Sequence, residues 1–277
     1  MVMWIAVEEW GVHAGSVGGV KMPMICHRVV IWRAATAVTA AAATTLAVSG
    51  PARAASGVDT GLRAVPRSSR ELIVVTAPRA SATAGTLRAE VRSGAGARWR
   101  PVLGPWPAEL GRRGLSAHRH EGDGTTPLGI FAIAPTLYGN APRPRGLRER
   151  YRRLGCGDWW DEDPASARYN RFVVVPCGVT PGFAAGSEAL WTETVAYPYF
   201  AVIEFNTHPI RRGRGAPGSG IFLHSWVDAP TDGCVAIDRS RLLSLLRWLA
   251  PSRRPVIAIS VIGAGSRTSS GAASEGH

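Results

Sequence analysis

The stretch Ser219–Asp238, S-G-I-F-L-H-S-W-V-D-A-P-T-D-G-C-V-A-I-D, decides how the rest of this chain is interpreted. An apolar run in it ends at His224, and Gly233 then brings Cys234 just ahead of a leucine-rich segment. A short apolar run is typical of a buried strand, and leucines at helical spacing are typical of an amphipathic helix. The stretch therefore holds a possible base and a possible nucleophile beside two predicted core elements.

A cysteine and a histidine that lie close together can form a nucleophilic pair. The thiolate is the reactive form of cysteine, and a neighbouring imidazole can take the proton and lower the thiol pKa. Gly233 has no Cβ, so a substrate carbonyl could approach the amides beside the sulfur, and these amides would hold an oxyanion. A structural interpretation stays open, because a histidine at a strand end or a Gly-Cys turn often serves packing alone.

The residues around the cysteine resemble a known active-site signature. Thr231–Val235, T-D-G-C-V, with His224 upstream, is similar to the signature of the L,D-transpeptidase (YkuD) family, and most similar to its Pro-Thr-x-Gly-Cys-Val-Ala branch. Thr126–Phe131, T-P-L-G-I-F, is similar to the segment before a central strand in these enzymes. The resemblance extends over residues 71–262.

The chain departs from the family pattern at three points. Asp232 stands where the best-known members have a second histidine, and the spacer before Thr231 is shorter than usual. Ala236 falls near the position where many members carry a substrate-binding arginine. The auxiliary role of the second histidine therefore does not carry over to this sequence.

The resemblance implies a fold and a set of site residues. The fold would be mostly β, a YkuD-like β-sandwich of mixed sheets with a helix after the catalytic cysteine. Cys234 would be the nucleophile and His224 the general base and acid, with the Gly233 and Cys234 amides as oxyanion donors. A backbone carbonyl near Ser225 would orient the histidine. No cofactor and no metal are implied, and a carbapenem would acylate the cysteine.

The implied activity is acyl transfer on peptidoglycan stem peptides. The chain would be an exported cysteine acyltransferase that forms L,D (3-3 type) cross-links or attachments through a thioester intermediate. An L,D-carboxypeptidase or wall-peptide hydrolase with the same site stays open, because Asp232 replaces the usual histidine. A non-catalytic wall-binding protein is the third possibility, which the presence of both His224 and Cys234 disfavours.

The N-terminal segment, residues 1–54, is interpreted as a signal peptide. Basic residues precede an alanine-rich apolar run at 34–48, and A-R-A at 52–54 offers small residues to a signal peptidase. The run is shorter than the roughly 20 residues that a membrane span needs, although an uncleaved anchor stays open. Met22 or Met24 could be the true start. We therefore expect an exported protein, in the cell wall or periplasmic space or secreted, with no stable membrane span after cleavage.

Charge and cysteine content fit an exported protein. The chain carries a net charge of +12, and removal of residues 1–54 leaves +10. Such a surface favours anionic cell-wall polymers as partners, and no nucleic acid is expected because no module with interleaved basic and aromatic residues is present. Three cysteines remain after the signal, so one thiol is left over. We expect Cys156 to pair with Cys177 and Cys234 to stay free, the alternative being three unpaired thiols.

The remaining pattern predicts a strand-rich domain. Residues 55–70 are predicted to be a linker and 263–277 a disordered Gly/Ser tail. A helix is predicted from an N-cap at Asp238 to Leu249, before Pro251. β-branched or alternating residues predict strands at 71–76, 86–91, 99–103, 171–175, 199–205 and 255–262.

Two further groups of residues are candidate sites. His118, His120, Glu121 and Asp123 match no metal-ligand spacing, so an exposed turn is favoured, and His208 is also expected to be exposed. Residues 140–170 are predicted to be irregular, and could form a wall of a substrate groove or a loop pinned by its tryptophans. The substrate-binding candidates are Trp160, Asp161, Asp163, Tyr169, Asn170 and the motif residue Asp232.

Overall fold

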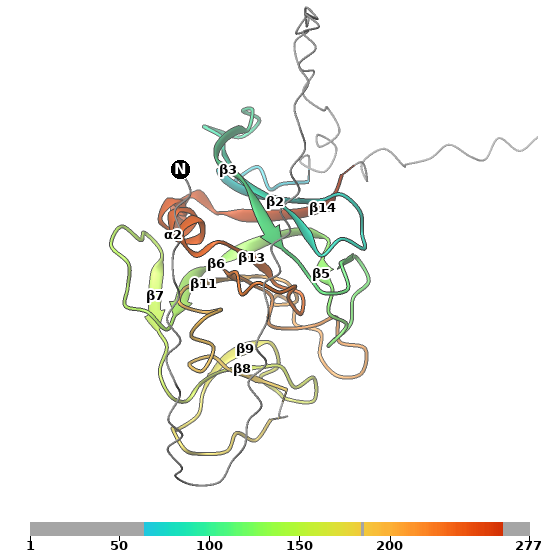
Figure 1. Ribbon diagram of the computed structural model, residues 1–277, viewed down its shortest axis with the longest axis vertical. Helices are drawn as coiled ribbons and strands as arrows, with labels where there is room; N and C mark the ends of the chain where they lie inside the picture. The colour runs from blue at the N-terminus through green and yellow to red at the C-terminus, as the bar shows by residue number, and fades with distance from the viewer. Residues whose placement is uncertain (1–63, 184–185, 263–277) are drawn as a thin grey trace, which may run out of the picture. The chain divides into compact units, whose positions relative to one another are not determined.

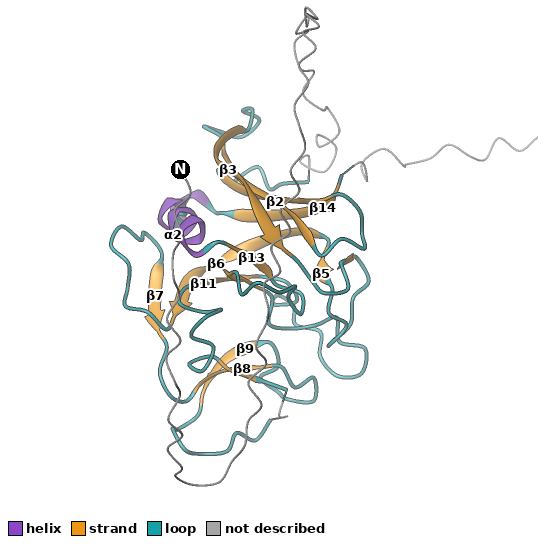
Figure 2. Cartoon of the chain, viewed as in Figure 1, coloured by secondary structure: helices purple, strands orange, loops and turns teal. Residues whose placement is uncertain are grey.

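The computed structural model describes residues 64–183 and 186–262, which form or connect β-strands with one α-helix among them (Figures 1 and 2). The predicted signal peptide and C-terminal tail lie outside the described residues. The described end of the predicted linker, residues 64–70, contains no strand or helix.

The elements have the following bounds. The strands are β1 (Glu71–Ala77), β2 (Ala84–Val91), β3 (Arg100–Glu109), β4 (Leu115–Ser116), β5 (Thr126–Pro127), β6 (Gly129–Gly139), β7 (Arg150–Arg153), β8 (Asp158–Asp161), β9 (Arg171–Val174), β10 (Glu188–Ala189), β11 (Phe200–Ile203), β12 (Phe222–Ser225), β13 (Val235–Ile237) and β14 (Val256–Val261). The helix is α2 (Arg239–Trp248), and a 3-10 turn, η1 (Pro251–Arg253), follows it.

A nine-stranded sheet forms the main body, in the order β11-β12-β13-β3-β2-β1-β14-β6-β7. Strand β11 also pairs with β6, so the sheet folds back on itself around a core. The pairs β1–β14, β12–β13 and β6–β7 are parallel, whereas the other pairs of this sheet are antiparallel. The predicted fold class, mostly β with mixed sheets and a helix after Cys234, is confirmed.

Strand β1 shows how the sequence builds this body. All seven residues of E-L-I-V-V-T-A are buried, because β1 lies between β2 and β14 and is covered on both faces. Ile73 and Val75 face the main core, while Leu72 and Val74 contribute to a smaller cluster on the other side. A continuous β-branched run is the pattern expected of such a strand.

Strand β3 is longer than predicted. The prediction ended at residue 103, where Gly104 and Pro105 begin, but the strand continues to Glu109. Its ladder with β2 shifts register around Ala89. Irregular pairing tolerates prolines, which have no N–H to donate, and this explains why a turn-like dipeptide lies inside a strand.

Helix α2 agrees closely with its prediction. The Asp238 side chain accepts hydrogen bonds from the amides of Ser240 and Arg241, at 3.0 and 3.1 Å, and so caps the first turn. Leu242, Leu245 and Leu246 are fully buried in the main core. The helix begins just after β13, so its packing fixes the strand that carries the cysteine.

The region 140–170 is not irregular as predicted. It contains β7 at the edge of the main sheet and β8, the central strand of a three-stranded sheet with the order β10-β8-β9. In D-W-W-D of β8, Trp160 points into a second apolar cluster, where its ring meets Phe222 edge to face. Composition suggested a loop because D-W-W-D is only four residues long and does not alternate polar with apolar residues.

A disulfide joins the flanks of the β8–β9 pair. Cys156 and Cys177 are bonded with a Cα–Cα distance of 5.3 Å, while Cys234 is a free, buried thiol. This is the pairing that the odd cysteine count suggested. Among residues 64–183 and 186–262, no helix is long and apolar enough to cross a membrane.

Glu149 gives a testable dependence of stability on pH. Its carboxylate is buried without a hydrogen-bond partner, and burial, together with Glu71, raises its pKa from 4.5 to about 7. The folded state then binds this proton more tightly than the unfolded state, so stability is lost as pH rises from about 4.5 through 7.

We expect Glu149→Gln to raise the free energy of unfolding at pH 8 by about 1 to 3 kcal/mol, with little effect at pH 5. Urea unfolding of both proteins at the two pH values measures this. Glu193→Gln, which removes the same charge from an exposed position, serves as the control. An equal effect of Glu149→Gln at both pH values would show that the group does not titrate as described.

Candidate active site

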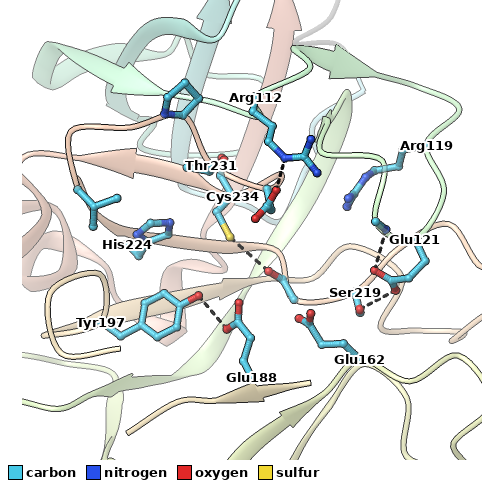
Figure 3. A pocket seen from close by; sticks show the side chains of 15 residues that line it. Arg112, Arg119, Glu121, Glu162, Glu188, Tyr197, Ser219, His224, Thr231 and Cys234 are labelled. Atoms are coloured by element: carbon cyan, nitrogen blue, oxygen red, sulfur yellow. Dashed lines mark hydrogen bonds and ion pairs between the residues drawn. The ribbon is translucent and has the colours of Figure 1, made fainter. Parts of the chain in front are cut away.

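Strands β12 and β13 bring His224 and Cys234 to one face of the main sheet. The strands are parallel, with Leu223 opposite Val235, which places Cys234 opposite Phe222. Because side chains alternate along a strand, Phe222, His224 and Cys234 point away from the main core that holds Leu223. Figure 3 shows the imidazole and the sulfur side by side on one wall of a pocket.

The thiol of Cys234 is buried and already hydrogen bonded. Its Sγ donates to the Gly220 carbonyl and accepts from the Phe222 amide, both at 3.3 Å. Burial, followed by the carboxylate of Glu188, raises the thiol pKa above its ordinary value, and the Phe222 amide only partly opposes this. The resting cysteine is therefore a neutral thiol rather than the thiolate of an ion pair.

The imidazole of His224 has a fixed orientation. Its Nδ1 lies 2.8 Å from the Ser225 carbonyl oxygen, which can only accept, so Nδ1 carries the proton and Nε2 holds the lone pair that a base needs. The backbone of Ala196 also interacts with the ring. The ring packs edge to face on Tyr197, with centroids 5.4 Å apart. Burial lowers the histidine pKa to about 4, so the imidazole is neutral near pH 7.

Gly233 is required by the backbone before the cysteine. Its φ of 138° is a conformation that residues with a Cβ rarely adopt, and a Cβ there would lie 2.8 Å from the Thr125 carbonyl. The Gly233 amide donates to the Thr231 hydroxyl at 3.1 Å, and that hydroxyl donates to the Cys234 carbonyl at 2.7 Å. One of the two amides predicted to hold an oxyanion is thus engaged in this state.

The pocket in front of the sulfur has a volume of about 450 Å³ and is lined by many charged groups. Sequence reasoning did not assign most of them to the site, because they come from loops and strands far apart in the chain. The charged residues that line the pocket, besides the histidine and the cysteine, are Arg112, Arg119, Glu121, Glu162, Glu188 and Asp232.

Four predicted substrate-binding residues do not line this pocket. Trp160, Asp161, Tyr169 and Asn170 are all buried. The Trp160 indole donates to the Asn170 side chain at 3.0 Å, and Asp161 accepts from the Asp163 amide at 3.0 Å. The Asn170 side chain also accepts from the Gly220 amide at 3.1 Å, and the Tyr169 hydroxyl donates to Glu121. These residues therefore lie behind the pocket lining and support it, and none of the four faces the pocket itself.

Two other predicted residues lie closer to the pocket. Asp232 lines it, with an exposed side chain in an ion pair with Arg112. Asp163 lines a neighbouring hollow together with His120. Neither residue contacts the thiol or the imidazole through a hydrogen bond in the part of the chain that the structure describes.

The histidines of the turn at 118–123 and His208 are surface residues, whereas Arg119 and Glu121 of the same turn line the pocket. Asp123 accepts from the His120 and Thr125 amides, both at 2.9 Å, and so shapes the turn. His118, His120 and His208 are exposed. No cluster of three or more potential metal ligands occurs within the described ranges.

These features define a class of protein: a mostly β domain in which a free thiol and an oriented imidazole line one charged pocket. Residues 86–257 match the L,D-transpeptidase catalytic domain (YkuD), so the chain belongs to this family. The match covers more than half of the chain and includes both His224 and Cys234. No curated protein and no solved structure gives a significant match.

Proposed function

We propose that this protein is an exported cysteine acyltransferase that forms L,D (3-3 type) cross-links or attachments between peptidoglycan stem peptides. Family membership supports the reaction class. The observation that carries the proposal is the oriented imidazole of His224, with Nδ1 held by Ser225, beside the free thiol of Cys234. The net charge of +10 on residues 55–277 supports retention on anionic wall polymers.

The first half-reaction forms a thioester. As Sγ of Cys234 attacks the donor carbonyl, its proton passes to Nε2 of His224, because the neutral imidazole is the available base. The S–C bond forms, the C–N bond to the terminal residue breaks, and the imidazolium gives its proton to the leaving amine. Rotation about the Cβ–Sγ bond redirects the S–H from the Gly220 carbonyl, where it rests.

The second half-reaction releases the acyl group. The amine of a second stem peptide attacks the thioester, its proton passes to His224, the new amide C–N bond forms and the S–C bond breaks, and the imidazolium returns the proton to Sγ of Cys234. Water in place of the amine would give a carboxypeptidase. Asp232 supports keeping this second candidate, since its exposed carboxylate lines the pocket at the position where the resemblance implies a histidine.

Incubation of the purified protein with a disaccharide-tetrapeptide, followed by mass spectrometry, tests the proposal. We expect a cross-linked dimer formed with loss of one terminal residue. A trimmed tripeptide without dimer would assign the protein as a hydrolase instead. Unchanged substrate would support a wall-binding role without catalysis and contradict both enzymatic candidates.

A further inference from the structure

Arg119 is a buried cation without matching hydrogen bonds. Its side chain is 3% exposed, and its Nε and Nη1 have no hydrogen-bond partner among the described residues. The nearest carboxylate oxygen belongs to Asp123, 3.5 Å from Nε, and the guanidinium also lies over the Phe205 ring. Because an incompletely paired buried charge is costly, such a group signals a missing anionic partner.

The position of Arg119 places that partner beside the nucleophile. Arg119 lines the pocket, and its Nη2 lies 3.1 Å from where a Cβ of Gly233 would be. Gly233 directly precedes Cys234, so an anion on this guanidinium would sit against the reacting carbonyl. A guanidinium fork matches the geometry of a carboxylate.

Glu162 is the complementary acid of the pocket. Its carboxylate packs against Gly220, whose carbonyl accepts the Cys234 thiol, and it accepts no hydrogen bond within residues 64–183 and 186–262. The neighbouring acids are already engaged: Glu121 accepts from Ser219 at 2.7 Å, and Glu188 accepts from Tyr197 at 2.8 Å. Glu162 is therefore the acid available to a cation. Burial, followed by Glu188 and Glu121, raises its pKa well above 4.5, so Glu162 is protonated until a bound cation favours its ionised form.

We propose that Arg119 and Glu162 form a subsite for a zwitterionic amino-acid head group, with the ammonium and the carboxylate on one carbon. A purely anionic ligand would leave Glu162 without a cation. A purely cationic ligand would leave the Nε and Nη1 donors of Arg119 without a hydrogen-bond partner. Both residues flank the sulfur, through Gly233 and Gly220 respectively, and face the same pocket (Figure 3).

This inference deepens the proposed function and rests on it for the identity of the ligand. The head group has two possible sources: the side-chain end of a diamino acid in the donor stem peptide, or a free amino acid that accepts the acyl group. The donor source predicts that amidation of the head carboxylate, a change that leaves the scissile bond itself intact, weakens recognition of the whole peptide.

Binding to the Cys234→Ala protein tests the subsite without requiring turnover. Three stem tetrapeptides are compared by calorimetry: one with the free head group, one with its carboxylate as a carboxamide, and one without its amine. We expect the zwitterionic peptide to bind about 10- to 100-fold more tightly than either analogue. A free D-amino acid that competes as well as the peptide would assign the subsite to the acceptor.

Further substitutions in the Cys234→Ala protein test which residue recognises which charge of the head group. Arg119→Gln should remove the preference for the carboxylate and retain the preference for the amine, whereas Glu162→Gln should do the reverse. Arg112→Gln is the matched control, because this arginine lines the same pocket but is paired with Asp232 and should affect all three peptides alike.

Several outcomes would overturn the subsite. These are equal binding of the three peptides, no binding of any peptide at millimolar concentration, or an equal loss for all three in Arg119→Gln. The last result would instead make Arg119 a group that serves the oxyanion or the fold. Selective binding without turnover by the unmodified protein refutes the proposed function alone, and turnover without selective binding refutes the subsite alone.

Discussion

Replacing Cys234 with alanine is expected to abolish product formation, with a loss of roughly 10⁴-fold or more in kcat/KM. The reason is that the thioester cannot form without the sulfur, and no other thiol lines the pocket. Cys156 and Cys177 are joined in a disulfide, so Cys234 is the one free thiol within the described residues. Product formation from the disaccharide-tetrapeptide measures the loss.

Intact-protein mass gives a second readout of the same substitution. The family resemblance implies that a carbapenem acylates the nucleophilic cysteine, so the unmodified protein should gain one adduct and Cys234→Ala none. The Arg112→Gln protein is the control: it is altered elsewhere in the pocket and should still gain the adduct. An adduct that survives in Cys234→Ala would remove this residue from the role of nucleophile.

Local sequence signals predicted much of the fold and the central pair of the site. The β-branched run of β1 and the Asp238 cap of α2 need only their own residues to be recognised. His224 and Cys234 were found because their motif is compact and resembles a family signature. In each case the information lies within a few neighbouring residues.

The sequence did not predict which of the polar and aromatic side chains are buried. Trp160 and Asn170 could equally have lined a groove or filled a core, and the second apolar cluster beneath β12 decides for the core. The same burial keeps the thiol and the imidazole neutral, where sequence reasoning expected the imidazole to lower the thiol pKa. Local composition does not report the desolvation that tertiary packing creates.

The charged lining of the pocket was missed for a different reason. Glu188 and Arg119 are far apart in the sequence, and they line the same pocket only because the small sheet packs against β12. A lone acidic or basic residue has no pattern that distinguishes it from a solvated surface charge. Asp232 is the exception, because it lies inside the active-site motif, and Glu121 and Glu162 each stand beside other acidic residues in the sequence.

Replacing His224 with alanine is expected to lower kcat/KM by about 10² to 10⁴-fold, because the thiol then loses its base and the leaving amine its acid. Product formation from the tetrapeptide at pH 7 measures the effect. His118→Ala is the matched control: this histidine is exposed and does not line the pocket, so its loss should leave turnover unchanged. Retained activity in His224→Ala would assign the proton transfers to another group.

The pH dependence of the unmodified protein provides an independent check on the histidine. The base must be neutral, and burial lowers the pKa of His224 from 6.5 to about 4. Protonation of His224 should therefore lower kcat/KM only near pH 4, because the imidazole stays unprotonated at pH 6. Glu188 has a pKa raised to about 7 by burial, so the profile is compared with that of Glu188→Gln. If kcat/KM instead falls near pH 6.5 in both the unmodified protein and Glu188→Gln, the imidazole of His224 is solvated when it reacts. The buried arrangement described above would then not be the reactive one.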